Sequence, residues 1–351
     1  MAASTTEEKN QNHSKVVCVT GANGFIGSWL VHSLLNKGYT IHATIFPGTD
    51  ASHLTTTTTN PSGGVKIFEL DIQNTNDIHN AIKGCEGVFH VASPCTLETP
   101  KDPNSELLVP ALKGTLYVIE AAAKYKVKRV VLTSSISALV PNPSWSNSVP
   151  VDENSWTDLD YCRSREKWYP ISKTQAEKEA WKKAEESGVD LVTILPSTCL
   201  GPLLQPSLNA SCAVLKQLLE GSKDTQEYHW LGVVHVKDVA NAQVLLYETP
   251  SASGRYLCTN GIYQFKDFAQ VVSKLYPEFP VHRFEEETQP GLVDCKNAAT
   301  KLLDLGLKFA PIEDAIRDTV ESLQTKGFLD KKERPNLANT RPGSEAWQPG
   351  L

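Results

Sequence analysis

The chain has 351 residues, of which 40% are hydrophobic and 21% charged, proportions typical of a globular protein with one large or two modest domains. The net charge of −6 argues against a nucleic-acid partner, which would need a basic face, and no apolar run approaches the roughly 20 residues of a membrane span. The first residues lack the apolar segment of a secretory signal, so we expect a cytoplasmic protein without a membrane anchor.

Strand-like and helix-like segments alternate along the first half of the chain. Residues 1–14 are expected to form a disordered leader. The predicted strands are Val16–Thr20, Ile41–Phe46, Val65–Leu70, Gly87–Val91, Arg129–Thr133 and Leu191–Leu195. The clearest predicted helices are Phe25–Asn36, Ser105–Lys124 and Thr174–Ser187. This alternation favours an α/β fold with a doubly wound parallel sheet covered by helices on both faces.

Three glycines separate the first predicted strand from the first predicted helix, in the spacing G-x-x-G-x-x-G. Gly21 permits a tight turn, Gly24 lets a pyrophosphate approach the backbone, and Gly27 allows close packing of the helix. The helix N-terminus, with Phe25 and Ile26 between the last two glycines, favours anionic phosphates. A glycine turn without a ligand is the alternative, but the strand–loop–helix context favours a Rossmann-type dinucleotide site.

The pattern changes after Pro196, where turn residues gather and a helix is predicted at about Ala210–Gly221. We therefore expect a dinucleotide-binding domain over residues 15–195, interleaved with later segments, and a smaller substrate-binding lobe mainly over 196–330. The stretch Thr55–Gly64 is interpreted as a loop without chemistry, and residues 331–351 as a disordered tail.

Tyr169 and Lys173 form a Y-x-x-x-K pair, whose members lie one turn apart on the same face of a helix. A free tyrosine has a pKa of about 10, and an adjacent ammonium lowers that pKa by favouring the phenolate. The Tyr169 hydroxyl is thereby suited to exchange a proton with a substrate oxygen near neutral pH. A surface tyrosine and lysine are the alternative. The order and spacing of the glycine loop, Thr133–Ser135 and this pair disfavour it.

The eight cysteines are scattered, form no C-x-x-C pair, and have no histidine at a metal-ligand spacing. We therefore expect reduced thiols and no metal site. Asn209–Ser211 matches a glycosylation sequon, but without an export route we expect it to be unmodified. His235 is interpreted as a structural residue rather than a general base.

The chain resembles the extended short-chain dehydrogenase/reductases, and within them the plant cinnamoyl-CoA reductase and dihydroflavonol reductase group. The resemblance spans nearly all of residues 15–329. The motifs that carry it are Phe89–Pro94, Asp152–Glu153 with Trp156, Lys167–Tyr169, Leu208–Ser211, Val234–Ala240 and Ser253–Cys258. It implies that Ser135 is the third catalytic residue and orients the substrate oxygen. It also implies that Lys173 holds the hydroxyls of the nicotinamide ribose.

The resemblance implies further site residues at the ends of strands. Besides the glycine loop, Tyr169 and Lys173, the implied cofactor-binding residues are Asp71, Ile72, Val91, Ala92, Ser93, Pro196, Thr198 and Ser211. Asp71 would bind the adenine ring, with a helix cap as an equal alternative. The residues expected to line the substrate pocket are Pro94, Val140, Tyr228 and Trp230. For Tyr228 and Trp230, core packing is an equal alternative.

This chain departs from the group at positions that select the ligand. Val214 and Gln217 stand where cinnamoyl-CoA reductases have a histidine and a lysine for coenzyme A, so that only Arg255 remains as a cationic partner. Val140 replaces an asparagine of the dihydroflavonol reductases. Phe46 replaces the arginine that binds the 2′-phosphate of NADP(H). The resemblance still implies NADPH, with NADH left open, and the polar side chains that could bind the phosphate instead are Thr44, Thr49, Ser52 and His53.

Together these features predict NADPH-dependent reduction of the carbonyl of a small aromatic or apolar aldehyde or ketone to the alcohol, with phenylpropanoids among the candidates. Reduction of a cinnamoyl-CoA-type thioester to the aldehyde, or of a dihydroflavonol-type ketone, is the alternative. A sugar-nucleotide epimerase or dehydratase and a non-enzymatic dinucleotide sensor are more distant alternatives. The expected partners are the small carbonyl substrate and, at most, a second copy of the chain, as a monomer or homodimer.

Overall fold

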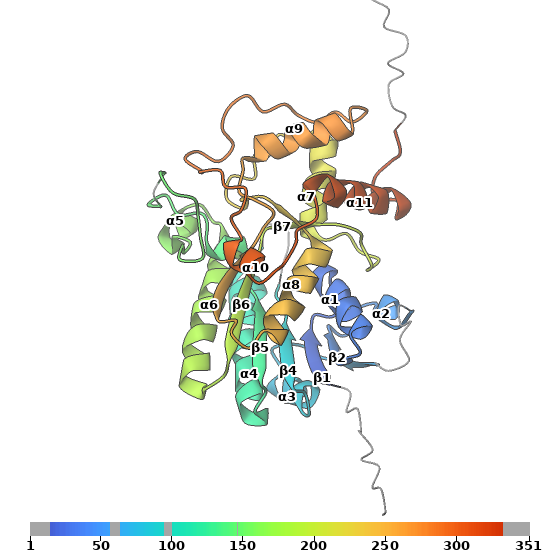
Figure 1. Cartoon of the computed structure of the whole chain (residues 1–351), viewed down its shortest axis with the longest axis vertical. Helices are drawn as coiled ribbons and strands as arrows, with labels where there is room; N and C mark the ends of the chain where they lie inside the picture. The colour runs from blue at the N-terminus through green and yellow to red at the C-terminus, as the bar shows by residue number, and fades with distance from the viewer. Residues whose placement is uncertain (1–14, 57–63, 95–99, 146, 333–351) are drawn as a thin grey trace, which may run out of the picture.

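The structure is a computed structural model that describes residues 15–56, 64–94, 100–145 and 147–332 (Figure 1). The expected leader at 1–14, nearly all of the expected tail at 331–351 and much of the loop Thr55–Gly64 lie outside the described residues. Within the described ranges, no helix combines the length and the apolar character needed to cross a bilayer.

Seven parallel strands form one sheet in the order β3-β2-β1-β4-β5-β6-β9, which confirms the predicted doubly wound α/β fold (Figure 1). The strands are β1 Val16–Thr20, β2 Thr40–Ile45, β3 Val65–Glu69, β4 Gly87–His90, β5 Arg129–Thr133, β6 Leu191–Pro196 and β9 Gly254–Cys258. The strand order reverses between β1 and β4, where Thr20 pairs with His90. Open α/β sheets bind their ligands at the carboxyl ends of the strands beside such a reversal.

Helices cover both faces of this sheet (Figure 1). They are α1 Phe25–Asn36, α3 Thr75–Ile82, α4 Val109–Tyr125, α6 Trp168–Ser187 and α8 Val236–Glu248, whereas α2 Ser52–Thr56 lies beside α1 and α5 Leu159–Ser164 beside α6. A π-helix, η1 Asn104–Leu108, precedes α4, and a 3-10 turn, η2 Ile136–Ala138, follows β5. On one face α4 packs against α3 and α6, and on the other α1 packs against α8.

Two helix boundaries differ from those expected. The helix α6 begins at Trp168 rather than Thr174 and carries Pro170 in its first turn, where a missing N–H breaks no helical hydrogen bond. The helix expected from Ser105 starts as the π-helix η1, because Pro110 has no N–H to donate to the carbonyl of Glu106 four residues earlier.

The second lobe lies at the carboxyl edge of the sheet (Figure 1). Its elements are β7 Thr198–Leu200, β8 Val233–His235, α7 Ala210–Leu219, α9 Phe265–Leu275, α10 Thr300–Asp304 and α11 Ile312–Thr325. From the same stretch of sequence, β9 joins the main sheet beside β6, and α8 covers it next to α1. The sheet and the lobe are therefore built from interleaved segments.

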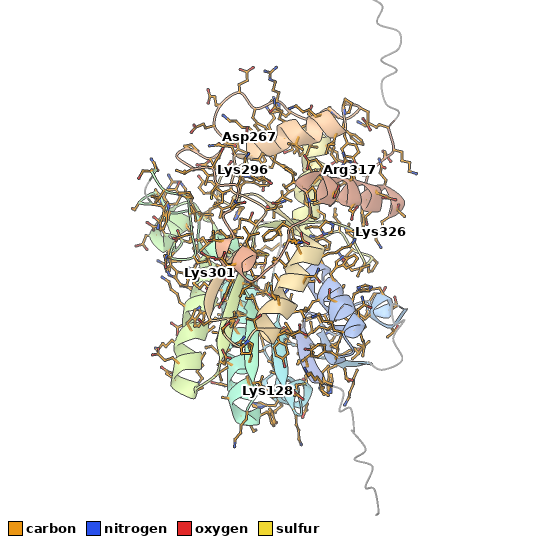
Figure 2. All side chains as sticks on the ribbon, viewed as in Figure 1. Lys128, Asp267, Lys296, Lys301, Arg317 and Lys326 are labelled. Atoms are coloured by element: carbon orange, nitrogen blue, oxygen red, sulfur yellow. The ribbon has the colours of Figure 1, made fainter. Side chains whose placement is uncertain are left out.

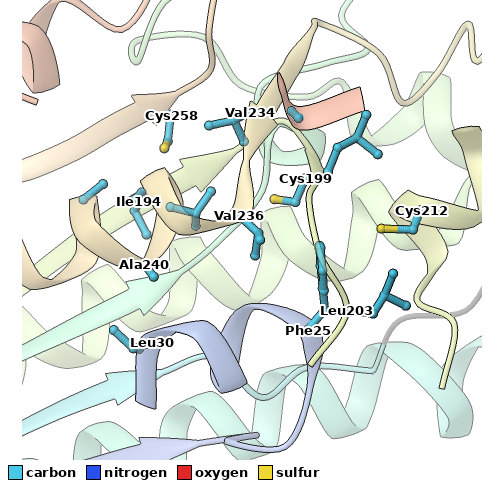
Figure 3. Packing of buried hydrophobic residues seen from close by; sticks show 14 of the residues in the cluster. Phe25, Leu30, Ile194, Cys199, Leu203, Cys212, Val234, Val236, Ala240 and Cys258 are labelled. Atoms are coloured by element: carbon cyan, nitrogen blue, oxygen red, sulfur yellow. The ribbon is translucent and has the colours of Figure 1, made fainter. Parts of the chain in front are cut away.

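One hydrophobic cluster joins the sheet to the lobe. Figure 3 shows Leu30 of α1 and Ile194 of β6 beside Val234 of β8 and Val236 of α8, all of them fully buried. Many charged side chains lie on the surface, among them Lys128 near one end of the sheet and Arg317 on α11 (Figure 2). The shared core holds the lobe in a fixed position above the strand ends.

Candidate active site

The glycine loop connects β1 to α1 in the conformation that close packing demands. Gly21 has a φ of +63°, and a Cβ there would lie 2.9 Å from the Cα of Ala92 at the end of β4. A Cβ on Gly27 would overlap the carbonyl oxygen of Gly21. Gly24 caps α1 without a side-chain hydrogen bond, so the first amides of the helix, at Phe25 and Ile26, remain for an anionic ligand. This loop fits the pyrophosphate of a dinucleotide.

The segment after β2 lies against the glycine loop. Asn23 donates from Nδ2 to Thr49 Oγ1 at 2.8 Å, and Ser28 Oγ lies 2.9 Å from His53 Nε2. Burial lowers the pKa of His53, with an opposing effect from Asp50. Phe46, at the end of β2, is 61% exposed. An exposed phenyl ring and a largely neutral imidazole give this region little positive charge for a 2′-phosphate.

A buried hydrogen-bonded chain fixes the ends of β1 and β4. Thr115 Oγ1 donates to Ala111 O, so His90 Nε2 donates to Thr115, 3.1 Å away. His90 Nδ1 then accepts from Thr20 Oγ1 at 2.8 Å, and Thr20 in turn accepts from the amides of Val91 and Ala92. Burial, with a smaller effect from the charge of Lys173, lowers the pKa of His90 to about 3. A neutral His90 thus orients the strand end that faces the expected nicotinamide ribose.

Two of the expected catalytic residues, Lys173 and Ser135, lie at the carboxyl end of β5. Lys173 is 6% exposed and donates from Nζ to the carbonyl oxygen of Thr133 at 3.0 Å, at the end of β5. Ser135 follows that strand end, is 9% exposed and accepts from the amide of Ser137. The helix α6, which carries Tyr169 and Lys173, packs against η2, the turn that Ser135 caps. The structure therefore brings β5 and α6 together as the sequence spacing required.

A buried ion pair lies behind this edge. Glu177, one helical turn after Lys173, is 1% exposed and accepts from Arg255 Nε at 2.7 Å and from Ser134 Oγ at 2.6 Å. The guanidinium of Arg255 also donates to the carbonyl oxygens of Glu153 and Ser155, both at 2.7 Å. Arg255 is therefore not available to coenzyme A, and the expectation that it remains as a cationic partner is wrong.

The segment from Tyr228 to Trp230 passes beside Tyr169. The ring of His229 lies 6.4 Å from that of Tyr169, centroid to centroid, and edge-on to it. Tyr228 precedes His229 and lies 4.4 Å below the ammonium of Lys167. Trp230 follows it but is 2% exposed, packs on Phe265 and donates from Nε1 to a backbone carbonyl. The structure places Trp230 in the core instead of the pocket, with its ring among other aromatic rings.

The remaining expected cofactor residues lie along the strand ends. Asp71 closes a turn by accepting from the amide of Gln73, and the cap of α3 is Asn74 instead. Ile72 packs against Gly114 of α4. Ser93 and Lys173 both line one small cavity, and Pro94 follows Ser93. The other positions are Pro196 at the end of β6, Thr198 at the start of β7, and Ser211 in the first turn of α7. Their contacts with a cofactor stay predictions.

Two further residues that the sequence singled out, His235 and Val140, lie outside the group around Tyr169 and Lys173. His235 caps α8 by accepting from the amide of Lys237, and its Nε2 lies 3.2 Å from Asp318. These contacts agree with its interpretation as a structural residue. Val140 is half-buried and packs with the cluster around Ile136 and Leu139, next to the strand end that carries Ser135.

Three residues of the site were absent from the sequence-based prediction: Thr20, Glu177 and His229. Glu177 shares a helical face with Lys173, and that i, i+4 spacing is the signal that would have revealed it. Thr20 and His229 contact partners that are far away in the sequence, His90 and Tyr169, so no local pattern identifies them.

Comparison with known proteins agrees with this arrangement. The NAD dependent epimerase/dehydratase family matches residues 17–258. Cinnamoyl-CoA reductase 1 of Petunia hybrida is 43% identical over 322 residues, covering 90% of this chain and 94% of that protein. The crystal structure of vestitone reductase from alfalfa superposes with a TM-score of 0.74 at 33% identity, covering 90% of this chain and 99% of that one.

Yeast methylglyoxal/isovaleraldehyde reductase Gre2, solved in complex with NADPH, has a TM-score of 0.74 and 28% identity, with 89% of this chain and 99% of that chain covered. The relatives with these names are reductases, and the fold, the glycine loop and the Tyr169–Lys173 pair are all present in this chain. The chain therefore belongs to the NAD dependent epimerase/dehydratase family of extended short-chain dehydrogenase/reductases and is an NAD(P)(H)-dependent oxidoreductase.

Proposed function

We propose that the protein reduces the carbonyl of a small aromatic or otherwise apolar aldehyde or ketone to the alcohol, using NADPH, in the cytoplasm. The observation that carries the proposal is the placement of Lys173, which is buried against Thr133 O one helical turn after Tyr169. A buried ammonium beside a phenol favours the phenolate and prepares the hydroxyl for proton transfer.

Each catalytic side chain has a distinct role in this proposal. Tyr169 donates the proton to the carbonyl oxygen, and Ser135 holds that oxygen by a hydrogen bond. Lys173 lowers the pKa of Tyr169 and positions the ribose hydroxyls. The nicotinamide cofactor, when bound, supplies the hydride. Asp71 would hold the adenine of that cofactor, and the amides after Gly24 would hold its pyrophosphate.

The surroundings of the site favour a compact substrate over a coenzyme A thioester. Val214 and Gln217 of α7 offer no cation where cinnamoyl-CoA reductases have a histidine and a lysine, and Arg255 is engaged by Glu177. Coenzyme A carries phosphates that need cationic partners. The names of the relatives, which include cinnamoyl-CoA reductase and vestitone reductase, make phenylpropanoid carbonyls the first compounds to test.

Tyr169→Phe tests the mechanism directly. Loss of the proton donor should lower kcat by about 10²- to 10⁴-fold for every reduced carbonyl, while the Kd of NADPH, measured by fluorescence titration, stays within about twofold. Tyr125→Phe, at the far end of α4, is the matched control and should turn over like the wild type. Near-wild-type activity of Tyr169→Phe across a panel of aldehydes and ketones would refute the proposed role of Tyr169.

A further inference from the structure

A basic and aromatic group of side chains lies next to Tyr169, in contact with it through His229. We call it the basic rim and define it as Tyr161, Arg165, Lys167, Tyr228 and His229. Its first three members lie on α5 and the turn that leads into α6, and the other two on the segment before β8. The contact between His229 and Tyr169 places the rim beside the expected substrate carbonyl.

Both cations of the rim lie on tyrosine faces. The Lys167 ammonium is 4.4 Å from the centre of the Tyr228 ring, and the Arg165 guanidinium carbon is 3.9 Å from that of Tyr161. Among the described residues, neither cation forms an ion pair with a carboxylate within 4 Å. An aromatic ring does not neutralise the cation above it, so the cation can still bind an anion that approaches from the side opposite the ring.

His229 adds a polar group next to the catalytic tyrosine. Burial, together with the nearby charge of Lys167, lowers the pKa of His229 to about 4. Near neutral pH its ring therefore presents one N–H donor and one acceptor. The acidic groups around the rim, Asp224 and Glu227, act on His229 and Tyr161 only at longer range.

The backbone holds the two rim segments in uncommon conformations. Glu166 and Gln226 each have a φ of +55°, and the only other described non-glycine residue with a positive φ is Lys126, which ends α4. Left-handed conformations of non-glycine residues cost energy and gather at functional sites. Here they stand directly before Lys167 and three residues before His229, in the two segments that form the rim.

We propose that the basic rim binds a carboxylate carried on the aromatic body of the carbonyl substrate, with Lys167 as its main cationic partner and His229 as a hydrogen-bond donor. The inference rests on the proposed carbonyl reduction, since it names the substrate class of that same site.

Two matched aldehydes test the inference, benzaldehyde and 4-carboxybenzaldehyde, each reduced with NADPH. In the wild type, kcat/KM should be about 10- to 100-fold higher for the carboxylate, mainly through KM, because a charge-assisted hydrogen bond is made in the bound state. Lys167→Gln should remove most of that ratio, and added salt should reduce it. Lys178→Gln is the matched control. Lys178 lies on α6, and its ammonium also lies over an aromatic ring, but that ring belongs to Trp156, which is not part of the rim.

A binding measurement separates this inference from the proposed function. Benzoate and benzyl alcohol are titrated calorimetrically into the protein with NADPH, and the wild type should bind benzoate about tenfold more tightly or better, with the preference lost in Lys167→Gln. Equal binding of the two compounds to the wild type overturns the rim as a carboxylate site, whether or not aldehydes are reduced. Failure to reduce either aldehyde, with the benzoate preference intact, overturns the proposed reaction and leaves the rim supported.

Discussion

Replacing Glu177 by alanine should lower the free energy of unfolding by about 3–5 kcal/mol. The Glu177 carboxylate is 1% exposed and neutralises Arg255, which is itself 9% exposed. Its oxygens accept from Arg255 Nε at 2.7 Å and from Ser134 Oγ at 2.6 Å. The alanine variant leaves a buried guanidinium without its counter-charge and a buried hydroxyl without its acceptor, and each loss adds to the cost.

Urea denaturation measures this change, and the melting temperature should fall by roughly 6–10 °C for a chain of this size. The control is Asp160→Asn, which breaks an ion pair with Arg163 at a side chain that is 93% exposed and should change the stability by less than about 0.5 kcal/mol. Catalysis should weaken as well, because Ser134 adjoins Ser135. A loss of less than about 1 kcal/mol in Glu177→Ala would contradict the account of this pair.

Three further changes test other parts of the site. In Phe46→Arg, the ratio of the Kd for NADH to the Kd for NADPH should rise about tenfold, because the guanidinium can bind the 2′-phosphate. Val149→Arg, at another exposed site, should leave this ratio unchanged. Val214→His with Gln217→Lys should lower KM for cinnamoyl-CoA thioesters, and an unchanged KM would show that the pair is not limiting. His90 has a folded pKa of about 3 against 6.5 when unperturbed, so the unfolded chain binds more protons as the pH falls from about 6.5. Stability should therefore drop by up to about 1.4 kcal/mol per pH unit over this range, and His90→Gln should flatten the drop in denaturation curves at pH 7 and 5.

Local sequence pattern predicted the parts of the fold and site that depend on neighbours along the chain. The β-branched run Val16–Thr20 and the helix Phe25–Asn36 appear at the predicted residues. The loop between them has the turn that the glycine spacing required, with Gly21 at positive φ against Ala92. Both features depend on backbone conformation and periodicity, which sequence records directly.

The contacts between residues that are far apart in the sequence could not be predicted, because no local pattern identifies both partners. Arg255 matched a family position and looked available, yet it pairs with Glu177, 78 residues earlier. The five residues of β9 were not among the predicted strands, and they form a strand where β6 supplies a parallel partner. Trp230 and His229 are adjacent, yet one packs in the core and the other faces Tyr169, a distinction that only the folded segment makes.

The fate of the hydride tests the central claim most directly. The protein is incubated with a panel of aromatic aldehydes and NADPH deuterated at the transferred position of C4, and the products are analysed by mass spectrometry and NMR. The account predicts an alcohol with one deuterium on the former carbonyl carbon and one NADPH consumed for each alcohol formed, with the rate lost in Tyr169→Phe. Conversion of a substrate without net consumption of NADPH, as in an epimerase that recycles its cofactor, would contradict it.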